Sequence, residues 1–388
     1  MAKASMTTRK EIIERQKTAY AKAEKKEKGK ILDNVCLNTG LSRDRAKRLL
    51  GKNGHIASKK RKQGRITKYD AAFVTALEKI WAYMDFACGK RLVAGMNDML
   101  EALLQCNEIN AEPETIKNLR TVSAATADRL LAKARKGLQL KGKSTTKPGT
   151  LLKKDIPIRL GGEWDDAIPG FVEIDLVAHC GETTAGDYVN TLDVTDVCTG
   201  WTETAAVLNK AQVHVFSALV DIGKKLPFPY KGIDSDNGSE FINGHLYRYC
   251  KRNNICFTRS RPYRKNDNCH VEQKNWHVVR RNIGYNRYEG LEAVSAMNEY
   301  YASLRLYSNY FLPQAKLTAK IRVGAKVQKQ YDIPKTPYRR LLESSHITPE
   351  VKEKLHNTFV SLNPAALKRD MACALGRLES FRVHMRNT

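Results

Sequence analysis

Three acidic residues in the middle of the chain have the types and the spacing that phosphoryl transfer requires. Asp175 lies in a β-rich run that begins after Pro169-Gly170, Asp236 directly follows a second strand-like stretch, and Glu272 falls in what reads as the first turns of a helix. Three carboxylates delivered this way can hold two divalent cations about 3.5–4 Å apart, which activate an attacking oxygen and neutralise a leaving one. Carboxylate oxygens suit Mg²⁺ because a hard cation prefers hard ligands. The alternative is that these are ordinary surface acids among the 41 in the chain.

Three sequence stretches resemble a known superfamily. The order Asp175, Asp236 within Asp-Asn-Gly-Ser-Glu-Phe, then Glu272 after 35 further residues (237–271), resembles the DDE transposase and retroviral integrase superfamily. Residues 171–181 (FVEIDLVAHCG), 233–243 (IDSDNGSEFIN) and 257–276 (FTRSRPYRKNDNCHVEQKNW) look like ISNCY-type bacterial insertion-sequence transposases. The resemblance is strong over about residues 145–345 and weaker before them. One departure from retroviral integrases is that no His-His-Cys-Cys zinc module precedes the catalytic region.

The resemblance implies a chemistry and a set of partners. It makes Asp175, Asp236 and Glu272 the catalytic residues and metal ligands, with Asp175 bridging two Mg²⁺ ions for which Mn²⁺ can substitute. The expected substrates are the terminal inverted repeats of a mobile element and a target DNA. Because two element ends must be joined together, a homo-oligomer on double-stranded DNA is expected.

Neighbouring acids and histidines compete for the ligand roles. Asp234 would share a strand face with Asp236, and Glu173 with Asp175. We favour Asp236 because the Asn-Gly that follows it matches the family turn. Asp234, Glu173, Asp193 and Asp196 are expected to be structural or to support the ligands, and Glu240 also suits a helix start. His179, His270 and His277 are expected to be solitary histidines rather than ligands.

Composition limits the class of protein. A chain of 388 residues predicts several domains. The net charge of +26 implies a polyanionic partner, and DNA fits better than a membrane because no basic amphipathic helix with an aromatic face stands out. No apolar run approaches a membrane span and no signal peptide is evident. Nine scattered cysteines without a Cys-x-x-Cys pair indicate reduced thiols rather than a zinc site. We therefore expect a bacterial cytoplasmic protein associated with the nucleoid.

The N-terminal third is expected to be helical. Residues 1–30 are dense in Lys, Arg and Glu and predict either a frayed helix or a disordered basic arm, of which we favour the arm. Residues 31–64 are assigned to a helix-turn-helix DNA-binding unit whose second helix Ser42 can cap. Residues 42–50 and 123–131 share Ser, Ala, Arg, Leu and Leu at equivalent places, which predicts a second such unit within a helical region at 65–137. The alternative for both is an ordinary pair of capped helices.

The remainder divides into a linker, a catalytic region and an extension. A basic linker at 138–158 leads to the catalytic domain at 159–312, where hydrophobic patterns predict strands at 171–178, 188–195, 200–207, 230–235 and 255–259. Helices are predicted at 209–225, at 241–252 and from Glu272 to about residue 283. These patterns give only an α/β domain, and the resemblance supplies a ribonuclease-H-like fold with a mixed five-stranded sheet. In the basic C-terminal region at 313–388, residues 317–323 and 325–331 predict a hairpin that either binds DNA or only packs, before a helical tail.

Basic residues predict two DNA-contacting surfaces. The second helix of the first helix-turn-helix unit carries Arg43, Arg45, Lys47 and Arg48. A second set surrounds Glu272 and would bind phosphates beside the acids: Arg259, Arg261, Arg264, Lys265, Lys274, Arg280 and Arg281. The alternative for the second set is a solvated helix face.

The sequence therefore predicts a multidomain DDE transposase. An all-α helix-turn-helix N-terminal region recognises DNA, the ribonuclease-H-like domain cleaves strands at the element ends and transfers the 3′-hydroxyl into target DNA, and a basic β/α extension follows. Three alternatives stay open: an integrase of a phage or retroelement, a nuclease that cuts without joining, and a catalytically silent, sequence-specific DNA-binding protein.

Overall fold

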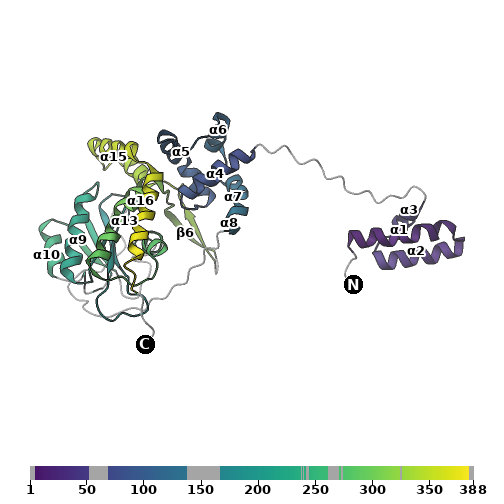
Figure 1. Ribbon diagram of the computed structural model, residues 1–388, viewed down its shortest axis with the longest axis horizontal. Coiled ribbons are helices and arrows are strands. Elements are labelled where there is room, and N and C mark those ends of the chain that lie inside the picture. The colour runs from purple at the N-terminus through teal and green to yellow at the C-terminus, as the bar shows by residue number, and fades with distance from the viewer. Residues whose placement is uncertain are drawn as a thin grey trace. The chain divides into compact units, whose positions relative to one another are not determined.

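A computed structural model gives the arrangement of the chain (Figure 1). It describes residues 5–51, 69–137, 167–236, 238, 240–241, 244–260, 271, 274–323 and 326–383. Contacts divide the chain into two compact units, residues 1–68 and residues 69–388. The predicted linker at 138–158 and the candidate ligand Glu272 lie outside the described residues.

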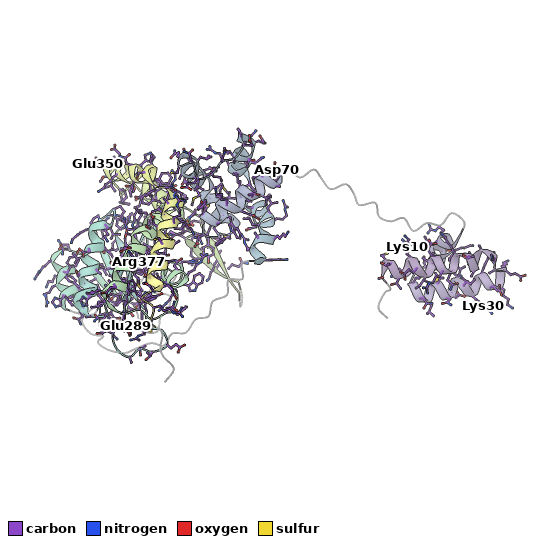
Figure 2. All side chains as sticks on the ribbon, viewed as in Figure 1. Lys10, Lys30, Asp70, Glu289, Glu350 and Arg377 are labelled. Carbon is purple, nitrogen blue, oxygen red and sulfur yellow. The ribbon has the colours of Figure 1, made fainter. Side chains whose placement is uncertain are left out.

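The first unit is a three-helix bundle. Helices α1 (Met6–Lys22), α2 (Lys25–Thr39) and α3 (Arg43–Leu50) enclose a small core that includes Ile13, Tyr20 and Leu32. Its outer surface is charged, as Lys10 and Lys30 show in Figure 2. The expectation of a disordered basic arm is therefore wrong for α1. Ile13 and Tyr20 lie seven positions apart on one helical face, and burying them against α2 and α3 stabilises a segment that is otherwise almost entirely polar.

Two helices joined by a turn lie where the first helix-turn-helix unit was predicted. The turn passes through Gly40, whose φ of 67° is readily adopted by glycine. Ser42 precedes α3 but its side chain makes no capping hydrogen bond. Helix α2 also begins earlier than expected, at Lys25. DNA recognition by this element stays a prediction.

The helical region at 65–137 does not stand apart from the rest of the second unit. It forms the helices α4 (Ala71–Tyr83), α5 (Gly89–Gln105), α6 (Pro113–Thr121), α7 (Ala124–Leu130) and α8 (Ala132–Gly137). Their buried side chains join one core with α13 (Gly290–Phe311) and α16 (Pro364–Glu379). The Tyr307 hydroxyl donates to the Tyr83 carbonyl, and Arg91 Nε donates to the Pro313 carbonyl at 2.6 Å. The regions expected as separate domains at 65–137 and 313–388 thus pack against the catalytic region.

The catalytic region contains a mixed five-stranded sheet, as expected. Its strands are β1 (Phe171–Ala178), β2 (Asn190–Asp196), β3 (Thr202–Val207), β4 (Gly232–Ser235) and β5 (Cys256–Arg259), in the order β3-β2-β1-β4-β5. Strands β1, β2 and β3 pair antiparallel, whereas β4 and β5 extend the sheet parallel to β1. This sheet and its flanking helices fit a ribonuclease-H-like core.

The two faces of the sheet differ in polarity. On one face, Val172, Ile174 and Leu192 pack into an apolar core with α9 (Gln212–Lys225) and α10 (Gly244–Arg252). Across the other face lie α13 and the π-helical segment η1 (Asn275–Arg280), which continues into α12 (Arg281–Ile283). The predicted helix after Glu272 is thus present but wound more loosely than an α-helix over six residues.

The C-terminal region begins with the predicted hairpin. Strands β6 (Leu317–Val323) and β7 (Lys326–Tyr331) pair antiparallel, and α14 (Pro337–Glu343), α15 (Pro349–Ser361) and α16 form the helical tail. Helix α16 lies along α13, which closes the core of the second unit (Figure 1). No helix in the described part of the chain is long and apolar enough to cross a membrane.

A buried ion pair joins α13 to β3. Arg305 Nε and Nη2 donate to the Glu203 carboxylate at 2.6 and 2.8 Å, and Trp201 Nε1 donates to the same carboxylate at 2.8 Å. The Glu203 side chain is only 1% exposed, so its charge depends on these donors.

Replacing Arg305 with Met is expected to destabilise the second unit by about 3 kcal/mol, because Glu203 then stays buried with its charge uncompensated. Urea unfolding followed by circular dichroism measures the change. The matched control is Lys224→Met, which removes an exposed partner of Asp221 and should cost less than about 1 kcal/mol. Equal costs for the two variants would show that the Glu203 pair contributes no more than a surface contact.

Candidate active site

Acidic side chains gather on the sheet face opposite the α9–α10 core. In register, Glu173 of β1 lies between Thr195 of β2 and Asp234 of β4, and Asp175 of β1 lies opposite Asp193 of β2. Because successive strand residues alternate between faces and these positions are paired, all of them share one face. Glu173, Asp193 and Asp234 are 0% exposed. The sheet therefore carries a buried acidic face.

Asp175 and Asp236 occupy corresponding positions on neighbouring parallel strands. The last residue pair between β1 and β4 is Ile174 with Ser235. Asp175 directly follows Ile174, and Asp236 directly follows Ser235. Asp175 accepts hydrogen bonds from the Leu176 amide at 2.8 Å and from Asn275 Nδ2 at 2.6 Å. Asp236 accepts from the Gly238 amide at 2.9 Å, and burial, with the nearby Glu240 charge, raises its pKa. The two carboxylates predicted from sequence are thus carried side by side by the sheet.

The residues on either side of Glu272 are bonded to β1. The Val271 amide donates to Glu173 Oε2 at 3.1 Å, and Asn275 bonds Asp175 as described. Glu272 itself lies outside the described residues, so its role as third ligand stays a prediction. Among the residues that the structure does describe, no group of three acidic, histidine or cysteine side chains forms a metal site. The donor chemistry of Asp175 and Asp236 nonetheless suits a hard divalent cation.

Glu173 and Asp234, the acids expected to support the ligands, are engaged within the protein. Asp234 accepts a hydrogen bond from the Thr258 hydroxyl at 2.5 Å, and Glu173 accepts from the Val271 amide. Each therefore connects β1 or β4 to a neighbouring element.

Asp193, expected from the sequence to be structural or to support the ligands, is a candidate functional residue. It lies opposite Asp175. Burial raises its pKa to about 7, although the positive charge of Lys274 acts to lower it. The Thr195 hydroxyl donates to its Oδ1 at 3.0 Å, while Oδ2 has no hydrogen-bond partner among the described residues. Burial lowers the pKa of Lys274 to about 7, and Lys274 Nζ donates to the Gly200 carbonyl at 3.0 Å. A buried acid and a half-buried amine thus adjoin the paired carboxylates, and the position of Asp193 opposite Asp175 follows from the β1–β2 register.

Comparison with known proteins gives a full-length relative. The chain is 38% identical over 338 residues to "Uncharacterized protein y4rM" of Sinorhizobium fredii (strain NBRC 101917 / NGR234). The aligned region covers 87% of this chain and 95% of that protein. The chain belongs to the y4rM family. No protein-family model matches the sequence.

Solved structures similar to this y4rM-family chain are viral integrase core domains. The HTLV-2 integrase catalytic core domain in complex with magnesium (dimeric form) is 13% identical, with a TM-score of 0.30, and covers 39% of this chain and 93% of its own. The catalytic core domain of BIV integrase is 18% identical, with a TM-score of 0.29, and covers 46% and 96% respectively. The fold of this chain is defined by its own strand order and strand pairing.

The predicted DNA-contacting residues of this y4rM-family chain fall into three groups. Arg43, Arg45, Lys47 and Arg48 are exposed on α3, as their predicted role requires. Arg261, Arg264 and Lys265 lie outside the described residues. The remaining four, Arg259, Lys274, Arg280 and Arg281, lie half-buried or buried within the second unit.

The last group lies mostly within the second unit. Arg259 is 4% exposed and pairs in register with Ser235 at the end of β4, and its contact with DNA stays a prediction. Arg281 is held by Asp85 at 2.7 Å, and Arg280 lies over the Tyr285 ring at 4.7 Å. DNA contact by these two arginines and by Lys274 stays a prediction.

His179 of this y4rM-family chain is buried rather than on a DNA-facing surface. Its Nε2 lies 2.8 Å from the Thr191 hydroxyl, which in turn lies 2.7 Å from the Tyr301 hydroxyl. Burial, with a smaller contribution from the Arg280 charge, lowers the pKa of His179 to about 3. The ring is therefore neutral at pH 7 and joins β1, β2 and α13 through hydroxyl groups.

The His179 shift predicts an acid-sensitive fold. A histidine whose folded pKa lies below its unfolded value binds its proton more readily when unfolded, so its contribution to stability is present above about pH 6.5 and is lost as the pH falls. Between pH 7 and pH 5 the wild type should lose about 2 kcal/mol more stability than His179→Gln, measured by urea unfolding. Exposed His346, replaced by Gln, is the control. Parallel pH profiles for wild type and His179→Gln would contradict this assignment.

Proposed function

We propose that the chain is a DDE-type DNA transposase, which cleaves strands at the ends of a mobile element and transfers the freed 3′-hydroxyl into target DNA. The observation that supports it most is the position of Asp175 and Asp236, one step beyond the last residue pair of neighbouring parallel strands. The hydrogen bonds from Val271 and Asn275 to β1 acids add support, because they hold these two residues, one on either side of Glu272 in the sequence, against the same sheet face.

In this proposal Asp175, Asp236 and Glu272 hold two divalent cations, Mg²⁺ by preference. When bound, the cations supply activation of the attacking oxygen and stabilisation of the leaving oxygen. The amide of Asn275 orients Asp175 by binding Oδ2, and the Leu176 amide fixes Oδ1. Gly238 does the same for Asp236 through its backbone amide. Fixed carboxylates need little rearrangement when a cation arrives, which favours binding.

DNA is the proposed partner for reasons of charge. The net charge of +26 suits a polyanion, and exposed Arg45, Lys47 and Arg48 on α3 give the first unit a basic helix suited to a DNA groove. A homo-oligomer on DNA is part of the proposal, because two element ends must meet for joint insertion.

Strand transfer in vitro tests the reaction. Labelled DNA carrying the ends that flank the gene is incubated with supercoiled plasmid and Mg²⁺ or Mn²⁺, using wild type, Asp175→Asn, Asp236→Asn and Glu272→Gln. Each of the three substitutions should lower joined product by more than about 100-fold, because each removes a charged ligand. The control Glu182→Gln removes an exposed acid from the turn after β1 and should join normally.

The products separate the other functions. Cleavage without joining by wild type identifies a nuclease, and specific binding without chemistry in either metal identifies a DNA-binding protein. Equal joining by wild type and Glu272→Gln would exclude Glu272 from the site.

Asn275→Ala is expected to lower activity by about 10–100-fold, because Asp175 loses the donor that orients it. The Mg²⁺ concentration for half-maximal activity should rise as well, which a purely structural defect would not cause. Asn282→Ala is the matched control, since Asn282 donates to the carbonyls of His277 and Val278 and, among the described residues, to no carboxylate. If both variants keep the wild-type Mg²⁺ requirement, Asn275 has no part in positioning Asp175.

A further inference from the structure

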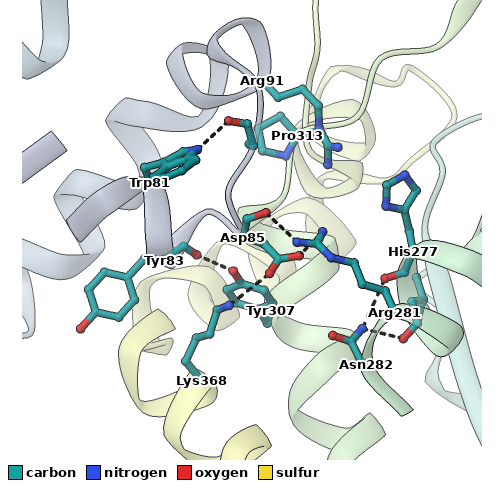
Figure 3. Close-up of polar contacts among 12 residues, drawn as sticks. Trp81, Tyr83, Asp85, Arg91, His277, Arg281, Asn282, Tyr307, Pro313 and Lys368 are labelled. Carbon is teal, nitrogen blue, oxygen red and sulfur yellow. Dashed lines mark hydrogen bonds and ion pairs between the residues drawn. The ribbon is translucent and has the colours of Figure 1, made fainter. Parts of the chain in front are cut away.

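A cavity of about 220 Å³ lies where α5, η1, α13 and α16 meet, separate from the acidic face. Figure 3 shows side chains converging there from different elements: Asp85 from the loop before α5, Arg91 from α5, Arg281 from α12 and Lys368 from α16. Neither Asp175 nor Asp236 lines it.

The lining carries more positive than negative charge. Asp85 is the one acid among its described lining residues, whereas Arg91, Lys274, Arg281 and Lys368 are basic. Asp85 is shared by Arg281 at 2.7 Å and Lys368 at 3.4 Å. Arg91 makes its hydrogen bond to a carbonyl, that of Pro313, and no carboxylate pairs with it within the described part of the chain. Unbalanced cations in a partly buried space repel one another, and an anion would relieve that repulsion.

The backbone beside the cavity is strained and firmly held. Asp85 and Phe86 both have positive φ, 56° and 55°, a conformation that residues other than glycine seldom adopt. Trp81 Nε1 donates across the turn to the Ala87 carbonyl at 2.9 Å, and the Tyr307 hydroxyl donates to the carbonyl of Tyr83. Strain of this kind persists where the surroundings fix it and is concentrated at ligand sites.

The rest of the lining is apolar. Met84, Leu304, Leu312 and Met371 share the wall with the Tyr307 ring, over which Lys368 Nζ lies at 5.0 Å. A bare inorganic anion would gain nothing from these side chains, whereas an organic anion would bury its apolar part against them.

We propose that this cavity binds a nucleotide, with the phosphate among Arg91, Arg281 and Lys368 and the base or sugar against the apolar wall. Guanidinium groups suit phosphate because they donate two parallel hydrogen bonds to it. The nucleotide has two sources, a free mononucleotide or an unpaired nucleotide at the end of a DNA strand. The site does not depend on the proposed strand transfer, because the carboxylates of that reaction lie elsewhere.

Calorimetry with the full-length protein tests the site. Thymidine 5′-monophosphate is titrated beside thymidine, which lacks the phosphate, and inorganic phosphate, which lacks the apolar part. Thymidine 5′-monophosphate should bind saturably and more tightly than either. Arg91→Gln and Lys368→Gln should each raise its Kd by about tenfold or more, because each removes a charged donor. The matched control Lys90→Gln removes an exposed charge from the adjacent position of α5 and should change the Kd by less than about twofold.

A second arm identifies the source. A single-stranded oligonucleotide with a 5′-phosphate is compared with the same strand bearing a 5′-hydroxyl. The site is assigned to a DNA end if wild type prefers the 5′-phosphorylated strand, Arg91→Gln and Lys368→Gln abolish that preference, and the mononucleotide does not bind. Thermal melting midpoints measured without ligand show which variants are folded. If Arg91→Gln is not folded, the Kd of Lys368→Gln alone decides the test. Wild-type protein that binds neither probe, or a Lys90→Gln effect equal to that of Arg91→Gln, overturns the proposal.

Discussion

The structure depends on carrying carboxylates on a sheet face that is closed to water. A buried charge costs several kcal/mol unless hydrogen bonds compensate it. Donors to Glu173, Asp193 and Asp234 come from three different elements: the Val271 amide before η1, the Thr195 hydroxyl on β2 and the Thr258 hydroxyl on β5. The bonds to Glu173 and Asp234 each fix a second element relative to the acid's own strand, whereas Thr195 lies on the same strand as Asp193. The acidic face thus ties β1 to the segment before η1 and β4 to β5.

That requirement also accounts for the segment around η1. Lys274 must approach Asp193 while Asn275 approaches Asp175, and Val278 and Val279 are both buried one turn later. The segment is wound as a π-helix over residues 275–280, and such segments are frequent at functional sites.

Local patterns in the sequence predicted the sheet well, because alternating Val172, Ile174 and Leu176 or Leu192 and Val194 require one apolar face. They placed Asp175 and Asp236 at strand positions that the sheet then brings together. The first helix was missed because Ile13 and Tyr20 alone carry its buried side. The contacts of Arg281 and Arg91 could not be predicted from the sequence, because their partners Asp85 and Pro313 lie 196 and 222 residues away. Asp193 was named from the sequence as structural or as supporting the ligands, but its position opposite Asp175 follows only from the register of β1 and β2.

The η1–α12 segment forms a wall that the acidic face and the cavity share. Its Asn275 binds Asp175, while His277 and Arg281 line the cavity and Lys274 approaches both. An anion in the cavity and cations at the carboxylates would therefore both act on this one segment. If the two ligands favour the same position of η1, each must strengthen the binding of the other, since coupling between sites is reciprocal.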